Sequence, residues 1–115
     1  MIAFWMAMLA MIQAEAPATE QSAQAAVNAW AACLGERVFG QAVTTVLSDD
    51  AIAAGAIEHC APLEATMLAE HERWLTAAAI DPERAERARN ALRASIEEIG
   101  EDLEESVRDI RSGER

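Results

Sequence analysis

Apolar side chains recur every three or four residues through most of this chain, and that spacing constrains the fold more than any other feature. An α-helix completes a turn in 3.6 residues, so such spacing gathers the apolar groups on one helix face. The first segment with this pattern runs from Thr19 to about Val46 and is rich in Ala and Gln. Its larger apolar residues are Val27, Trp30, Leu34 and Val38. We expect a helix here.

A second segment begins with a clear helix-start signal. Ser48 is a good N-cap residue, and Asp49 and Asp50 follow it in the first turn, where the helix dipole favours acids. Its apolar face comprises Ile52, Ala56, Cys60, Leu63, Met67, His71, Trp74 and Ala78. Pro62 lies inside this segment and should bend or divide the helix near Ala61, because proline lacks a backbone donor and disfavours helix at the preceding residue.

The third segment opens at Asp81-Pro82-Glu83, which combines an N-cap, a proline at the first helical position and an acid. Its apolar face comprises Ala85, Ala88, Leu92, Ile96, Ile99, Leu103, Val107 and Ile110. Gly100 weakens the middle of this helix by about 1 kcal/mol relative to Ala, which leaves a break there open.

The three segments have similar lengths, about 30 residues or roughly 45 Å each at the α-helical rise. Short connections between helices make them antiparallel neighbours. A chain of 115 residues has room for one domain. We therefore expect an all-α fold over residues 19–115, an antiparallel three-helix bundle or coiled coil.

The first 14 residues are uncharged and almost wholly apolar. They are shorter than the roughly 20 residues that span a bilayer, and they resemble the apolar region of a signal peptide. We expect a cleaved signal peptide over residues 1–18, with the cut before Thr19 or before Glu15. The segment lacks the usual positive charge, so an uncleaved membrane anchor and a cytosolic chain with a buried apolar tail remain as alternatives.

Cys33 and Cys60 suit a disulfide. In an antiparallel hairpin, facing residues are symmetric about the turn, and the midpoint of this pair falls between Val46 and Leu47, directly before the Ser48 cap. The side chains can then meet at the Cα separation of about 5.5 Å that a disulfide needs. Export would supply the oxidising compartment. We expect a bond that joins the first two helices and stabilises the fold by roughly 3 to 4 kcal/mol.

Other roles for these residues are less favoured. A redox pair usually has the Cys-x-x-Cys spacing, which is absent, and zinc would need His59 or His71 beside the thiolates. His59 points about 100° away from Cys60, and His71 is some 16 Å further along the helix. We predict no metal and no cofactor. Trp30 and Trp74 could line a ligand pocket, although tryptophans at helical spacing are more often core residues.

Charge restricts the partners. The chain has 20 acidic residues against nine basic ones, giving a net charge of -11. Such a field repels phosphate backbones and anionic lipid surfaces. We therefore expect no nucleic-acid partner, and membrane attachment only if residues 1–14 stay uncleaved.

The run Trp30-x-x-Cys33, an Asp-capped Ala-rich helix and Cys60-Ala61-Pro62-Leu63-Glu64 together resemble a class of small uncharacterised exported bacterial proteins with a two-cysteine helical hairpin. The resemblance covers residues 27–75. It implies export and a helical fold and brings no function with it.

No catalytic residue is predicted, because the chain has two His and no polar cluster among its apolar positions. Our first hypothesis is a non-catalytic periplasmic or secreted protein that binds another protein, or a second copy of itself, through a helix face. The alternatives are a membrane-tethered structural subunit, a binding module for small hydrophobic ligands and, last, a small enzyme.

Overall fold

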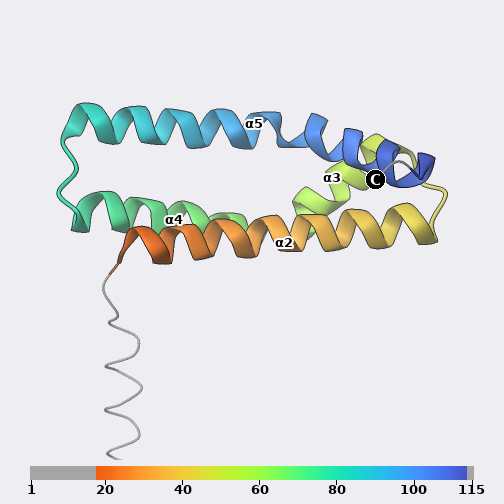
Figure 1. Cartoon of the computed structure of the whole chain (residues 1–115), viewed down its shortest axis with the longest axis horizontal. Coiled ribbons are helices and arrows are strands. Elements are labelled where there is room, and N and C mark those ends of the chain that lie inside the picture. Colours follow the sequence, from red (N-terminus) through yellow and green to blue (C-terminus); the bar gives the residue numbers. More distant parts are fainter. Residues whose placement is uncertain (1–17, 114–115) are drawn as a thin grey trace, which may run out of the picture.

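The computed structural model describes residues 18–113, and this part of the chain forms four helices and no strand (Figure 1). They are α2 (Glu20–Thr44), α3 (Asp49–His59), α4 (Ala61–Ala77) and α5 (Pro82–Ser112). The all-helical prediction is confirmed. The apolar segment over residues 1–14 and the cleavage position before Glu15 lie outside the described residues.

The second predicted helix is divided into α3 and α4. Cys60 ends α3 and precedes α4 with φ -94° and ψ 7°, and Pro62 lies in the first turn of α4. Because proline has no N–H to donate, it fits a first turn and interrupts a helix interior. The division therefore occurs where the sequence indicates. The third predicted helix, in contrast, continues through Gly100 as the single helix α5.

Helix starts follow local capping residues. The Thr19 side chain accepts from the backbone N–H of Ser22, whose hydroxyl in turn accepts from the Thr19 N–H. Ser48 and Asp81 cap α3 and α5 through their side chains, as the sequence predicts. Each cap satisfies backbone donors that have no partner inside the helix.

The end of α4 was not predicted. Ala79 adopts a left-handed conformation with φ 52°, while its N–H donates to Thr76 and the N–H of Ile80 donates to the carbonyl of Leu75. This pair of bonds is a Schellman motif, whose left-handed position usually holds glycine. The motif turns the chain from α4 towards α5.

The helices pack with α2 against α3, α4 and α5, and with α3 against α5. In Figure 1, α3 and α4 run antiparallel to α2, and α4 extends past the start of α2. The last helix, α5, then runs above them in the same direction as α2. The core comprises Trp30, Leu34, Val38, Ala42, Ile52, Ala53, Ala56, Cys60, Met67, Leu103 and Val107.

The apolar face of α5 is buried unevenly. Leu103 and Val107, in its second half, are buried, whereas Leu92 and Ile96 in its first half are only half-buried. The core is therefore concentrated where the second half of α5 meets α2 and α3.

Candidate functional site

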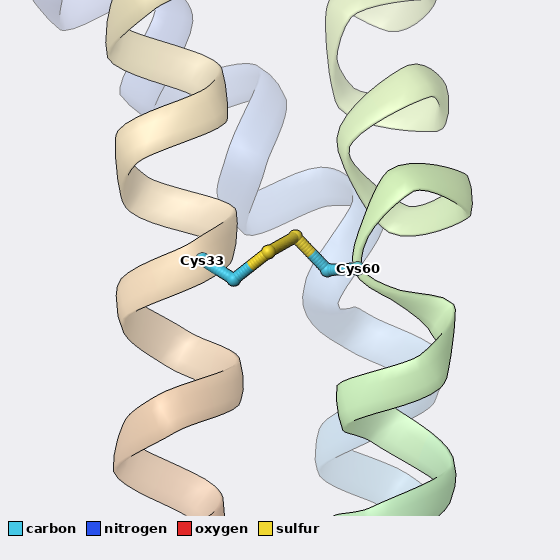
Figure 2. The surroundings of a disulfide bond; sticks show 2 residues. All are labelled: Cys33 and Cys60. Atoms are coloured by element: carbon cyan, nitrogen blue, oxygen red, sulfur yellow. A yellow bond between two sulfur atoms is a disulfide. The ribbon is translucent and has the colours of Figure 1, made fainter.

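Cys33 and Cys60 form a disulfide, with a Cα–Cα distance of 6.0 Å. The bond joins α2 to the junction between α3 and α4 (Figure 2). Cys60 is buried in the core, and Cys33 is half-buried at its edge. The predicted cross-link is confirmed, and it indicates an oxidising, non-cytoplasmic setting.

The two histidines lie in different surroundings. The ring of His71 meets that of Trp74 edge-on, with centroids 5.8 Å apart, and His59 is exposed at the end of α3. Over residues 18–113, no three His, Cys, Asp or Glu side chains form a group that could hold a metal ion.

Trp30 and Trp74 differ in their surroundings. Trp30 is a core residue, 6% exposed, and its Nε1 lacks a hydrogen-bond partner. Two surface hollows, of about 400 and 390 Å³, lie beside Ala18 and α4 and at the α4–α5 connection. Neither is lined by Trp30 or Trp74. These two hollows therefore lend no support to the tryptophan pocket.

A group of large apolar side chains is exposed at one end of the molecule. Phe39 and Val43 are 48% and 57% exposed and lie one turn apart on α2. Val46 and Leu47, in the connection to α3, are 102% and 48% exposed. We name these four residues the terminal patch. No local pattern marks Phe39 and Val43 as exposed, because each directly follows a residue of the buried face.

The connection that carries Val46 is fixed by hydrogen bonds. The hydroxyl of Thr45 donates to the carbonyl of Gln41 at 2.7 Å and accepts from the N–H of Leu47 at 3.4 Å. Ser48 then caps α3. Val46 therefore projects into solvent from a connection whose backbone is held on both sides.

Arg111, near the end of α5, also binds the residues that flank the α2–α3 connection. Its guanidinium donates to the carbonyl oxygens of Ala42 at 3.3 Å and Thr45 at 3.2 Å. It also pairs with the Asp49 carboxylate at 3.2 Å. We name this set of contacts the Arg111 clasp. One planar cation thus ties the last turn of α2 and the first turn of α3 to α5.

Phe39 and Val43 of the terminal patch lie on α2, a helix with few charged residues. Over its 25 residues, α2 carries only Glu20, Glu36 and Arg37 as charged groups, although the whole chain has a net charge of -11. At the start of α3, the Ser48 hydroxyl and then backbone N–H groups lower the pKa of Asp50, which keeps it ionised.

The opposite end of the molecule is joined by a surface ion pair. Arg89 of α5 donates to both carboxylate oxygens of Glu72 on α4, at 2.6 and 3.1 Å. The hydrogen bond from Arg89 lowers the pKa of Glu72, and the same bond raises the pKa of Arg89. Both groups are close to solvent, so this pair positions the helices more than it stabilises them.

None of the helices described over residues 18–113 is both long and apolar enough to cross a membrane. In comparisons with protein-family models, curated proteins and solved structures, nothing matches this chain.

Proposed function

We propose that this protein is a non-catalytic periplasmic or secreted protein that acts by binding another protein through the terminal patch. The observation that carries the proposal is the exposure of Phe39, Val43, Val46 and Leu47 together at one end. Soluble proteins rarely leave large apolar groups clustered in water, and such clusters commonly mark interaction sites.

The rigidity of the terminal patch supports the same role. A partner that binds a mobile loop must first order it, and that ordering reduces affinity. Here the Arg111 clasp and the Thr45 hydroxyl already fix the backbone on either side of Val46. The apolar groups are thus presented in one arrangement.

Export is supported by the disulfide and by the position of the first cap. Thr19 begins the capping box of α2, so cleavage directly before Thr19 would leave all four described helices whole. We further propose that α3 and α4 act as one divided helix of the mature chain, which with α2 and α5 would make the antiparallel three-helix bundle expected from the sequence.

Capture with matched variants tests the proposal. The oxidised protein would be immobilised and exposed to periplasmic extract and to concentrated culture medium. Phe39→Glu disrupts the terminal patch, whereas Leu68→Glu changes an exposed apolar residue on α4. We expect the wild type and Leu68→Glu to retain the same protein and Phe39→Glu to lose it. If all three retain the same proteins, or none retains any, the terminal patch is not the binding site.

A further inference from the structure

Two exposed acidic residues flank the terminal patch. Glu36 comes one turn before Phe39 on α2, and residues three apart on a helix are neighbours on its surface. Asp50 lies in the first turn of α3, three residues after Leu47, so the Cα atoms of these two residues are at most about 11 Å apart. Both acids are exposed, and in the part of the chain that the structure describes neither forms an ion pair. The apolar surface therefore has one unneutralised carboxylate on its α2 side and another on its α3 side.

The nearby cations leave these negative charges in place. Arg37 lies about 160° around α2 from Phe39, at 100° per residue, on the other flank of the buried face. Near the end of α5, Arg111 is already paired with a carboxylate of α3, and Arg108 is followed by an exposed acid, Asp109. The surroundings of the terminal patch are therefore acidic, in line with the net charge of -11.

A partner for this surface needs two kinds of group. Large apolar side chains would cover the terminal patch, and cations beside them would meet Glu36 and Asp50. An apolar centre with a polar rim is the usual anatomy of a protein interface, and opposite charges across the rim speed encounter and disfavour like-charged partners. Nucleic acids and anionic lipid surfaces are repelled by the same field, and so is a second copy of this chain, with its net charge of -11.

We propose that the terminal patch binds a basic amphipathic segment of another protein, in which large apolar side chains are flanked by Lys or Arg. This inference rests on the proposed function and names the chemistry of its partner. The four residues of the terminal patch are few beside the roughly 20–30 residues that each partner contributes to a standard interface. We therefore expect reversible binding, in about the micromolar range.

Two synthetic amphipathic helices of equal length test the charge of the partner. One combines Leu with Lys and the other Leu with Glu, and each has a fluorescent label for anisotropy titrations with the oxidised, mature protein. We expect the Leu/Lys peptide to bind and the Leu/Glu peptide not to bind. High salt should weaken the binding, because it screens exposed charges. Equal binding of the two peptides would overturn the proposal, and so would a failure of both to bind.

Neutral substitutions test whether the Leu/Lys peptide binds at the terminal patch. Phe39→Ser should weaken binding about tenfold or more, since it removes a large apolar anchor. Glu36→Gln and Asp50→Asn should each weaken it about two- to fivefold, the usual effect of losing an exposed ion pair. All three side chains are exposed, so circular dichroism should show an unchanged helix content.

Matched controls lie outside the terminal patch. Leu68→Ser changes an exposed apolar residue of α4, and Glu58→Gln changes an exposed acid near the end of α3. Both variants should bind the Leu/Lys peptide as the wild type does. If Glu58→Gln weakens binding as much as Glu36→Gln and Asp50→Asn do, the peptide responds to the overall charge of the chain and the proposed site is wrong.

The outcomes separate this inference from the proposed function. If the Leu/Lys peptide does not bind, but a protein retained from periplasmic extract is still lost with Phe39→Glu, the proposed function stands with a partner that is not basic. If the peptide does not bind and no protein depends on Phe39, both fail.

Discussion

The two ends of the molecule contain apolar side chains at similar helical spacing, but these side chains are buried to different depths. At the end containing the α2–α3 connection, Val38, Ile52 and Val107 are 1%, 2% and 0% exposed, and the Arg111 clasp ties α5 to the connection. At the end containing the α4–α5 connection, Leu75 and Ala85 are also buried, but Leu92 and Ile96 in the first half of α5 are only half-buried, and the polar link is the surface pair of Glu72 and Arg89. Periodicity thus decides which face of a helix is apolar, while the number of helices that meet decides the depth of burial.

The largest expected difference between the ends is in the stability lost when the same side chain, isoleucine, is shortened to alanine at each. Ile52→Ala should lower the free energy of unfolding by about 3 kcal/mol, within the range for buried aliphatic residues, because it leaves a cavity. Ile96→Ala, at a half-buried position of α5, should cost about half of that or less. Urea unfolding of both variants measures the difference, and equal losses would remove the distinction between the ends.

The Arg111 clasp provides the next test. Arg111→Ala should cost about 1–2 kcal/mol, since it removes a charged hydrogen bond to the partly buried carbonyl of Ala42 and exposed bonds to Thr45 and Asp49. Hydrogen exchange should also quicken at the N–H groups of Leu47 and Ala51. The matched control is Arg108→Ala, an exposed arginine on the same helix. If both variants behave alike, Arg111 does not hold the connection.

The α4–α5 connection should be improved by a glycine. Ala79→Gly relieves a left-handed backbone conformation that costs a residue with a side chain roughly 1–2 kcal/mol. Part of this gain is offset by the greater freedom of glycine in the unfolded chain. We expect a net rise of about 0.5–1 kcal/mol in the free energy of unfolding. A loss of stability would show that Ala79 packs in a way this account omits.

The smallest effect should be the pH dependence of the surface pair. Because the pKa of Glu72 is lowered in the folded chain, its contribution is present above the ordinary value of 4.5 and is lost as the pH falls through the lowered value. Glu72→Gln should therefore unfold slightly more easily than the wild type at about pH 7 and equally at about pH 2. A gap that persists in acid would have another cause.

Features set by neighbouring residues could be predicted from the sequence. The caps at Ser48 and Asp81 and the division before Pro62 depend on residues within one helical turn. The disulfide followed from symmetry about the α2–α3 turn. In contrast, Arg111 binds groups 62 to 69 residues away, and no local pattern indicates which carbonyls it reaches.

The exposure of the terminal patch could not be predicted from the sequence for a related reason. Phe39 follows Val38 and Val43 follows Ala42, so each exposed residue lies beside a buried one and looks like an extension of the same apolar face. Their exposure depends on how α2 is rotated against α3 and α5, and this rotation is a property of the packed helices.

The measurement that tests the account most directly is the intact mass of the protein from fractionated bacterial cells, alkylated with and without prior reduction. Our account predicts a species outside the cytoplasm, shortened to begin at Thr19 or Glu15, that accepts two alkyl groups only after reduction. A full-length cytoplasmic species that accepts both groups without reduction would contradict both the cross-link and the compartment.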